Sequence, residues 1–327
     1  MYEQYLITGA TSPVGRLVTK MLADNGSKVR ILIQSGADRS PFEGLDNIEI
    51  FEGEVFDKDS MKDFFKVEDP RHSVLIHMDE IVSASDKTNL NMRRVNVAGT
   101  QHVVDLSIKN KIGRMVWLGS AYALNPRSSL ENSVLHFDRT KVEGEYAKTK
   151  AEAGAYIIEK VSLNKFNAVI LLPTFIIGPG YDENSDMKVI LKHYIEKGVS
   201  TVKGGHAFVD VRDVADGLLA LSENGQVGGC YILSGEHRST DEFFEDVKKA
   251  GGIEKDVKPM PKWMMSKSLG KFVDTYYRIT KKDNPKEVYA LFMNNPDVKF
   301  NNTMGEVMPD SETRSVTESL GDVLNNG

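Results

Sequence analysis

The sequence predicts an α/β fold built on a doubly wound, Rossmann-like parallel sheet, and three observations support this. Short apolar runs alternate with helical patterns over the first two-thirds of the chain. Most of these runs are apolar throughout, as strands buried on both faces are. The first run leads through a glycine-containing turn into a helical pattern. Strand and helix repeated in this way are typical of a parallel sheet with helices on both faces.

The strand and helix segments can be assigned in order along the chain. Seven segments have the character of buried strands, at 4–9, 28–34, 47–53, 73–78, 114–120, 166–173 and 228–235. Helical patterns lie between them at 13–25, 58–66, 89–110 and 146–163. For the helix at 58–66, Asp57 and Ser60 are the expected capping residues.

After Pro173 the alternation ends, and a second region is expected. Residues 174–186 are rich in Gly, Pro and acidic residues and predict a loop, followed by a helix at 186–197. A strand running into a helix is expected at 206–224, and the tail from 236 is expected to be mostly helical, including an amphipathic segment at 262–280. We therefore expect a dinucleotide-binding domain at 1–173, to which 206–235 return, and a smaller, mostly helical substrate domain at 174–205 and 236–327.

The bulk composition limits the classes of partner. The 327 residues are 40% hydrophobic and 27% charged, with a net charge of −6 and a single cysteine. The acidic balance and the lack of a long basic run argue against nucleic acid. Cys230 is expected to be a buried strand residue, and one cysteine without a visible signal peptide fits the reducing cytoplasm. The longest apolar stretch contains a proline and is too short to span a membrane. The sequence leaves a homodimer open.

The stretch TGATSPVGR at 8–16 is close to a phosphate-binding turn. Gly9 and Gly15 stand where a dinucleotide fold needs a tight turn and close packing of helix on sheet. Ser12 replaces a middle glycine, and Pro13 has no N–H to offer a phosphate. Serine followed by proline also predicts an N-cap and the first helical residue. The motif alone therefore leaves open both phosphate binding and a capped helix without a ligand.

A tyrosine and a lysine in the helix at 146–163 are candidates for acid–base chemistry. Tyr146 and Lys150 are four residues apart and share one helix face. A nearby ammonium lowers the pKa of a phenol from about 10, which suits proton transfer at a carbonyl or alcohol. The pairs Tyr156–Lys160 and Tyr277–Lys281 have the same spacing. Tyr146 is favoured because it lies in the first turn of a helix at the ligand-binding edge of such a sheet.

Ser120 and Asn96 complete the candidate set. Ser120 follows the strand at 114–120, where a hydroxyl could bond a substrate oxygen and the tyrosine; a simple turn serine is the alternative. Asn96, in the helix at 89–110, could hold a water or a backbone carbonyl near Lys150, and capping or core hydrogen bonding is its alternative role. The seven histidines show no metal-ligand spacing, so no metal site is expected.

Five ordered motifs resemble the extended short-chain dehydrogenase/reductases, in their epimerase/dehydratase and dihydroflavonol-reductase-like branch. TGATSPVG is similar to the family's glycine turn, VNVAGTQHVV to its Asn-containing helix, and YAKTK to its Tyr-x-x-x-Lys motif. ILLPTFIIGPG and FVDVRDVADGLLAL resemble two later segments. The resemblance implies that Tyr146 donates the proton, Lys150 lowers its pKa and holds the nicotinamide ribose, and Ser120 orients the substrate oxygen. Asn96 would be the structural member of this catalytic set.

The resemblance also implies an NAD(P) site along the carboxyl edge of the sheet. Its expected residues are Gly9, Thr11, Ser12, Pro13, Val14, Gly15, Gln34, Arg39, Glu54, Val55, Met78, Asp79, Tyr146, Lys150 and Pro173. An acid after the second strand would select the ribose diol of NAD. Gln34 stands there instead, and Arg39 is within reach of a 2′-phosphate, which favours NADP(H).

Departures from the family pattern narrow the substrate and leave alternatives. Asp79 and Glu80 replace small residues after the fourth strand, and a carboxylate near the pyrophosphate would weaken cofactor binding. His206 stands where sugar-nucleotide epimerases carry an arginine, which favours a carbonyl or alcohol substrate without a diphosphate. The expected function is NADPH-dependent reduction of a small or aromatic carbonyl. A cofactor-sensing or degenerate binding protein and a sugar epimerase are the alternatives.

Overall fold

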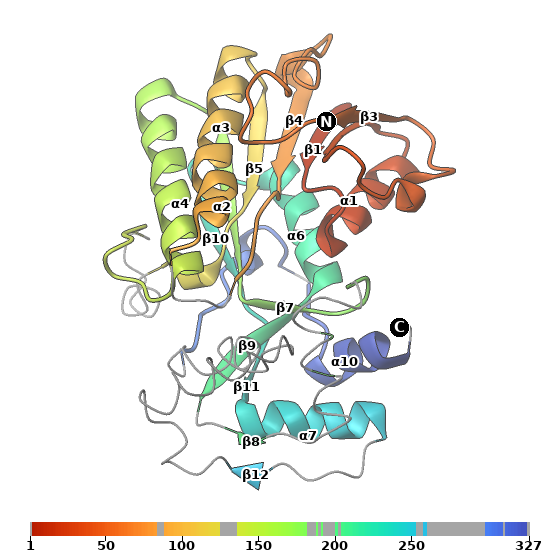
Figure 1. Cartoon of the computed structure of the whole chain (residues 1–327), viewed down its shortest axis with the longest axis vertical. Coiled ribbons are helices and arrows are strands. Elements are labelled where there is room, and N and C mark those ends of the chain that lie inside the picture. The colour runs from red at the N-terminus through yellow and green to blue at the C-terminus, as the bar shows by residue number, and fades with distance from the viewer. Residues whose placement is uncertain are drawn as a thin grey trace, which may run out of the picture.

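The computed structural model describes most of the chain (Figure 1). The described residues are 2–83, 88–124, 136–181, 188, 191, 200–201, 204–252, 258–259, 298–309 and 311–325. The expected helix at 186–197 falls outside them except for residues 188 and 191, and the amphipathic segment at 262–280 lies outside them entirely. None of the helices within these ranges is both long and apolar enough to cross a membrane.

A seven-stranded parallel sheet forms the larger part of the molecule, as the sequence predicts. Its order is β10-β6-β5-β4-β1-β2-β3, and every neighbouring pair is parallel. The strands are β1 (Gln4–Thr8), β2 (Lys28–Ile33), β3 (Ile48–Glu52), β4 (Ser73–His77), β5 (Arg114–Leu118), β6 (Ala168–Pro173) and β10 (Cys230–Leu233). The order reverses between β1 and β4, which is where doubly wound sheets bind their ligands.

Helices cover both faces of this sheet because successive strand residues point to opposite sides. Tyr5 and Ile7 of β1 pack with α1 (Pro13–Asp24) and α6 (Val211–Asn224). Leu6, between them, packs with α3 (Thr100–Lys109) and α4 (Glu145–Asn164) on the other face. Figure 1 shows these helix pairs on the two sides of the strands. The expected helix at 89–110 is divided into α2 (Leu90–Arg93), a π-helical turn η3 (Arg94–Gly99) and α3.

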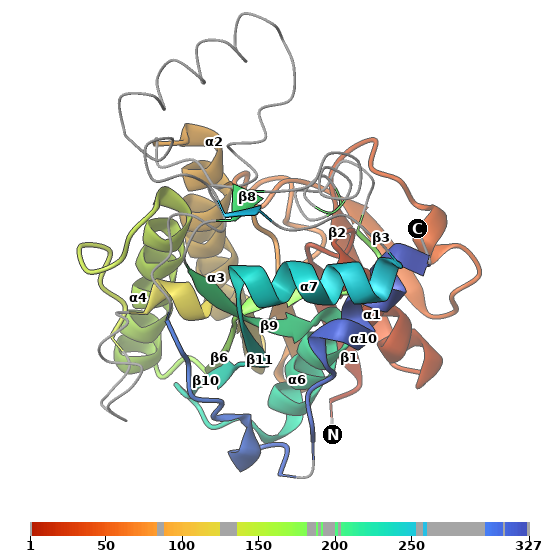
Figure 2. The same ribbon diagram turned by 90° about the horizontal axis from the view of Figure 1, so that it is seen from below.

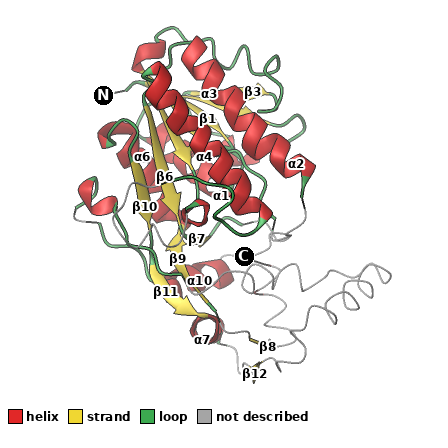
Figure 3. Ribbon diagram, turned by 90° about the vertical axis from the view of Figure 1, so that its left-hand side faces the viewer, coloured by secondary structure: helices red, strands yellow, loops and turns green. Residues whose placement is uncertain are grey.

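A smaller sheet lies beyond the carboxyl ends of the large one. Its order is β11 (Glu236–Ser239), β9 (Gly205–Asp210) and β7 (Phe175–Ile177). Helices α7 (Thr240–Gly251) and α10 (Val316–Asn325) pack on it through a separate apolar cluster that includes Phe208, Phe243 and Leu320. Figure 2 shows α7 and α10 lying across β9, and Figure 3 shows the smaller sheet continuing below the larger one. A short pair, β8 (Ser200–Thr201) and β12 (Lys258–Pro259), is parallel.

The structure differs from the sequence-based prediction of a helix at 58–66 and from the capping role expected for Ser60. The expected helix at 58–66 is wrong: residues 58–65 form turns, in which Asp57 Oδ1 accepts from Asp59 N at 3.0 Å. The Arg30 guanidinium donates to the carbonyl oxygens of Asp63, Phe64 and Lys66 at the end of this segment. Ser60 therefore caps no helix: its hydroxyl donates to Asp57 O at 2.8 Å and accepts from Glu54 N at 3.0 Å.

The second region contains more strand than expected. β11 occupies the first residues of the tail, and β9 belongs to the small sheet, whereas α6 and β10 return to the large one. The division into two domains at the expected residues stays a prediction. Cys230 begins β10, as expected for a strand residue, but it is only partly buried. Four short 3-10 helices, η1 (Ser40–Phe42), η2 (Pro70–His72), η4 (Ala121–Ala123) and η6 (Met304–Glu306), complete the described elements.

Candidate active site

The turn between β1 and α1 can be built only with glycine at two positions. Gly9 has a φ of +73°, and a Cβ there would lie 2.6 Å from the backbone carbon of Met78. A Cβ on Gly15 would lie 2.2 Å from Gly9 O. The chain therefore packs the start of α1 directly against the ends of β1 and β4. The exposed backbone at such a turn is the feature that lets a dinucleotide pyrophosphate approach a helix N-terminus.

Ser12 is the N-cap of α1, and Pro13 is its first residue, as one interpretation of the motif predicts. The Ser12 hydroxyl accepts from Gly15 N at 3.0 Å and donates to Gly9 O at 2.8 Å. Neither the Gly15 N–H nor Pro13 is then available to a phosphate in this arrangement. Of the residues Pro13, Val14 and Gly15, Val14 is then the one whose backbone N–H is expected to bind a phosphate. The turn fits a pyrophosphate, with fewer donors than a turn with glycine at position 12.

The ends of β2 and β3 bring Arg39 and an acid together. Arg39 forms an ion pair with Glu52, the last residue of β3. Ser35, next to Gln34, donates to the same carboxylate at 3.0 Å. Ile33 and Glu52 are partners in the parallel ladder, which explains why an acid from β3 stands beside the end of β2. Glu52 was not predicted, because an acid that binds the ribose of NAD was expected only after β2, whereas Glu52 ends β3.

Other expected cofactor residues line the same edge of the sheet. Val55 is fully buried just beyond β3, beside Glu54, and Met78 N donates to Thr8 O at 3.1 Å. Asp79 follows directly, and burial together with the nearby carboxylates of Glu54 and Glu80 raises its pKa to about 6. Pro173 ends β6. The structure thus places these residues at the carboxyl ends of the strands, while their contact with a cofactor stays a prediction.

Tyr146, Lys150 and Ser120 converge beside the end of β5. Tyr146 and Lys150 lie in the first two turns of α4, and the Lys150 ammonium donates to Leu118 O, the last residue of β5, at 2.8 Å. Its Nζ lies 6.0 Å from the centre of the Tyr146 ring. Ser120, two residues after β5, lies near the phenol, where its hydroxyl acts to lower the pKa of Tyr146. The structure therefore brings together three of the four residues that the sequence predicts as catalytic, while their catalytic roles stay predictions.

Glu80 joins this group in a way that the sequence analysis did not foresee. The Tyr146 hydroxyl donates to Glu80 Oε2 at 2.9 Å, and Lys150 Nζ lies 2.6 Å from the same oxygen. The Lys150 side chain is 2% exposed and that of Glu80 is 20% exposed. The carboxylate therefore compensates the buried ammonium. Glu80 follows β4, which pairs with β5, so the adjacency of these two strands was the available signal.

The pKa of Tyr146 is raised well above its usual value, contrary to the expected lowering by Lys150. Burial is the main cause, followed by the negative charge of Glu80 and its hydrogen bond with the phenol. The hydrogen bond from Ser120 acts in the opposite direction. The expected lowering is therefore wrong: burial of the phenol outweighs it, and the Lys150 charge is paired with a carboxylate that also binds the phenol.

Asn96 has a structural role rather than a direct contact with the phenol. Its side chain accepts from Ile81 N at 2.8 Å and donates to Ile81 O at 2.9 Å. It also donates to the Thr149 hydroxyl at 3.1 Å, which ties the same amide to α4. Asn96 lies in the π-helical turn η3, a kind of distortion often found at functional sites. It therefore holds the segment that carries Glu80 against the helix that carries Tyr146 and Lys150.

The described one of the other two Tyr-x-x-x-Lys pairs, Tyr156–Lys160, does not reach this site. Tyr156 donates to Asp105 at 2.6 Å, and Asp105 also pairs with Lys58 at 2.8 Å. The Lys160 ammonium lies over the Tyr156 ring, 4.7 Å from its centre. Tyr277 lies outside the described residues. The choice of Tyr146 among the three agrees with the structure where it can be compared.

Aromatic side chains extend the site toward the smaller sheet. The Tyr122 hydroxyl and His206 Nδ1 are 2.8 Å apart, which joins the loop after β5 to β9. Tyr122 also packs edge-on against Phe300, and His206 packs beside Phe175. The Tyr181 hydroxyl donates to Ile176 O at 3.2 Å, and burial with the charge of Glu80 raises the pKa of Tyr181. The position expected for an epimerase arginine is thus a buried histidine bonded to a tyrosine.

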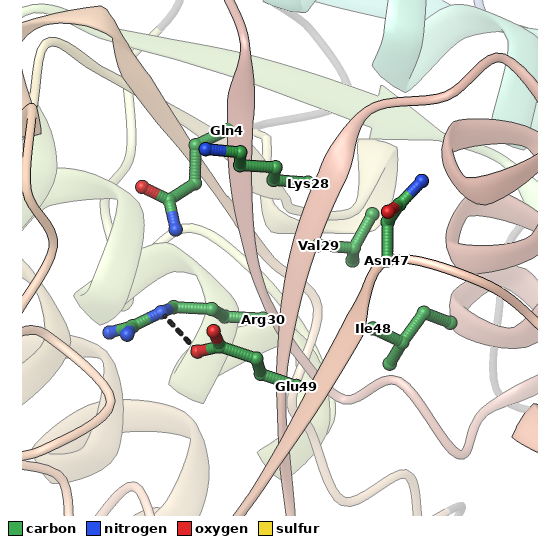
Figure 4. Close-up of a pocket in the computed structure, with 7 residues that line it drawn as sticks. All are labelled: Gln4, Lys28, Val29, Arg30, Asn47, Ile48 and Glu49. Carbon is green, nitrogen blue, oxygen red and sulfur yellow. Dashed lines mark ion pairs between the residues drawn. The ribbon is translucent and has the colours of Figure 1, made fainter.

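A surface pocket of about 270 Å³ lies at the opposite edge of the sheet (Figure 4). Its lining comes from the first residues of β1, β2 and β3, and an Arg30–Glu49 ion pair of 2.9 Å crosses it. Parallel sheets bind ligands at their carboxyl ends. This pocket is therefore separate from the candidate active site.

Comparisons with known proteins agree with the fold and identify the family. The profile of the NAD dependent epimerase/dehydratase family matches residues 5–233. Sterol demethylase protein B of Methylococcus capsulatus is 26% identical over 76% of this chain and 74% of its own length. A putative dihydroflavonol 4-reductase of Synechocystis is 23% identical over 81% and 77%.

Solved structures share the whole architecture. UDP-glucose 4-epimerase of Thermotoga maritima, solved with UDP-glucose, has a TM-score of 0.73 at 16% identity and covers 98% of this chain and 97% of its own. A Bordetella bronchiseptica enzyme in complex with NAD⁺ has a TM-score of 0.73 at 17% identity and covers 99% and 98%. At these identities the likeness establishes the fold. With the family match over most of its length, this chain belongs to the NAD-dependent epimerase/dehydratase family of Rossmann-fold enzymes.

Proposed function

We propose that this protein is an NAD(P)-dependent oxidoreductase that interconverts a carbonyl and an alcohol, working as a reductase of a small or aromatic carbonyl. The observation that carries the proposal is the convergence of Ser120, Tyr146 and Lys150 at the carboxyl end of β5. A positioned phenol that can give or take a proton is the group such a reaction needs. The nicotinamide ring, when bound, supplies the hydride.

Each side chain of the group has a role that its geometry supports. Tyr146 Oη is the atom that gives its proton to the substrate carbonyl oxygen. The Ser120 hydroxyl, which faces the same phenol, orients that oxygen. Lys150 Nζ has three donors, of which Leu118 O and Glu80 engage two, so the third is left for a ribose hydroxyl.

The relatives favour a reductase over an epimerase. Two of them are named as a putative dihydroflavonol 4-reductase and, over 42% of this chain at 30% identity, cinnamoyl-CoA reductase 2 of Arabidopsis thaliana. Both proteins are named as reductases. In this chain, Tyr122, Phe175 and Phe300 gather beside the site, and His206 replaces a diphosphate-binding arginine. These features support an aromatic carbonyl without a diphosphate.

The proposed cofactor is NADP(H), with the choice resting on Arg39. Its guanidinium stands near the end of β2, where a 2′-phosphate would lie, and Gln34 brings no charge there. The ion pair between Arg39 and Glu52 opposes this preference, because the Glu52 carboxylate could accept hydrogen bonds from the ribose hydroxyls of NAD(H). Both groups are half-exposed, so the pair is weak and can be exchanged for a phosphate. We also infer a cytoplasmic location from the single cysteine.

The experiment is a titration of both reduced cofactors followed by an activity screen. Calorimetry with NADPH and NADH measures binding, and loss of NADPH absorbance is followed with small aldehydes, ketones and flavanone-type carbonyls. Binding together with turnover of a carbonyl supports the proposal. Binding without turnover of any carbonyl or alcohol favours a cofactor-sensing protein. Absence of binding to either cofactor contradicts both.

A further inference from the structure

We propose that Glu80 carries the proton of the reaction between Tyr146 and water. This inference deepens the proposed function and rests on it. The starting observation is that one carboxylate oxygen receives both the Tyr146 hydroxyl, at 2.9 Å, and the Lys150 ammonium, at 2.6 Å. The phenolic proton therefore already points at an acceptor.

The solvent exposure of Lys150 and Glu80 shows which of the two can exchange a proton with water. Lys150 is sealed from solvent at 2% exposure, whereas Glu80 keeps 20% of its side chain exposed. A proton that reaches Glu80 can pass to water, and one taken from water can return to the phenol. Among the described residues, Glu80 is the carboxylate in direct contact with the Tyr146 oxygen. Ser120 and Tyr181 also lie near enough to affect the pKa of the phenol, and Lys150 Nζ lies 6.0 Å from the centre of its ring.

The position of Glu80 is fixed by its neighbours. Asn96 binds both backbone groups of Ile81, the next residue, and bonds to Thr149 of α4. The peptide that carries Glu80 is thus held against the helix that carries Tyr146. Within the described part of the chain, the Tyr146 hydroxyl donates to Glu80 and not to the neighbouring Asp79, so the role falls to Glu80.

The step balances for oxidation of an alcohol. The alcohol O–H bond breaks and its proton bonds to Tyr146 Oη, while the Tyr146 O–H bond breaks and that proton bonds to Glu80 Oε2. The oxidised nicotinamide, the oxidant of the proposed function, would when bound accept the carbinol hydrogen with its two electrons, so that the C–O bond becomes a carbonyl. Glu80 is then a carboxylic acid and returns its proton to water. In carbonyl reduction, every transfer is reversed.

The first test needs no substrate or cofactor. Tyrosinate absorbance near 295 nm is titrated with pH in wild type and Tyr146→Phe, and again in Glu80→Gln and the Glu80→Gln/Tyr146→Phe double variant. In each pair, the absorbance change that is lost on Tyr146→Phe is the ionisation of Tyr146 itself. We expect its ionisation at least about one pH unit lower in Glu80→Gln, because an anion is removed while the Lys150 ammonium stays. An unchanged Tyr146 titration overturns the proposal.

The second test measures the chemical step. Glu80→Gln is expected to slow oxidation of the alcohol by about 10²–10⁴-fold, the contribution of a positioned proton acceptor. In Glu80→Ala, added formate is expected to restore part of the rate, whereas equal chloride is not. The matched control is Asp105→Asn, which removes a carboxylate that likewise binds a tyrosine and a lysine, Tyr156 and Lys58, and leaves turnover unchanged.

The two proposals fail in different ways. Wild-type turnover in Glu80→Gln, with Tyr146→Phe inactive, overturns the role of Glu80 and leaves the oxidoreductase standing. A shifted Tyr146 titration in a protein that turns over no alcohol or carbonyl contradicts the proposed function, while the proton link between Glu80 and Tyr146 is supported.

Discussion

Asn96 binds both backbone groups of Ile81, accepting from its N–H at 2.8 Å and donating to its C=O at 2.9 Å. This pairing joins the loop after β4 to the π-helical turn and, through Thr149, to α4. It explains how a loop residue, Glu80, is placed beside two helix residues.

Removing the Asn96 amide should therefore affect both stability and the site. Asn96→Ala leaves the backbone of Ile81 without these bonds in a partly buried place, which is expected to cost about 1–3 kcal/mol in the free energy of unfolding. Urea denaturation measures this. Thr149→Val, which removes one of the three bonds, should cost less. An Asn96→Ala protein as stable as wild type would show that water replaces the amide.

Ser12→Gly is expected to tighten cofactor binding. The Ser12 hydroxyl now takes the Gly15 N–H, and its removal returns that donor to a phosphate. The gain should be about 1 kcal/mol, the scale of one cap hydrogen bond, while the loss of helix stability with glycine is only a few tenths. Calorimetric titration of the same cofactor into both proteins measures the difference. Equal affinities would mean that the cap does not compete with the ligand.

Tyr146→Phe should lower turnover by about 10²–10⁴-fold and leave cofactor affinity nearly unchanged. The reason is that the phenolic oxygen moves the proton, whereas Lys150 holds the ribose; Lys150→Met should harm both. Initial rates and cofactor titrations separate these effects. Tyr156→Phe is the matched control, because Tyr156 is bonded to Asp105 away from the site. Full activity in Tyr146→Phe would remove Tyr146 from the mechanism.

Arg39→Ala should reduce the preference for NADPH over NADH. Loss of a cation near the end of β2 weakens attraction for a 2′-phosphate and frees Glu52 to accept ribose hydroxyls. Competitive titration of the two reduced cofactors gives the ratio of affinities. Lys20→Ala, which breaks an exposed ion pair on α1, serves as the control for a lost surface charge. A ratio that does not change would show that Arg39 takes no part in the choice.

Asp79 should contribute stability to the cofactor-free protein that is lost as pH rises from about 4 through about 6. Asp79 has its pKa raised to about 6 in the folded state, so between these limits the folded protein binds more protons than the unfolded one. Asp79→Asn should remove this loss and be more stable than wild type above pH 6, by about 1–3 kcal/mol. Denaturation at several pH values measures it, with Asp46→Asn as an exposed control. A parallel pH dependence in Asp79→Asn and wild type would contradict the assignment.

The sequence by itself determined the parts of this protein that depend on neighbouring residues. Each strand of the large sheet was visible as a short apolar run. The pair Ser12–Pro13 specified a helix start, and the spacing of Tyr146 and Lys150 specified a shared helix face. These are local relationships, set by backbone sterics and by the periods of strand and helix.

Only the tertiary structure decided which distant groups meet. Glu80 lies 66 residues before Tyr146, and it reaches the phenol because β4 and β5 are neighbours and Asn96 fixes the loop between them. Likewise, Arg30 of β2 binds the carbonyl oxygen of Lys66, and Glu52 of β3 pairs with Arg39, which follows β2. Side-chain pairing between separate elements depends on sheet order and register, which no local pattern encodes. Burial of Tyr146, followed by its pairing with Glu80, reversed the expected sign of the pKa shift at Tyr146, and the same pairing is the basis of the proton path proposed for Glu80.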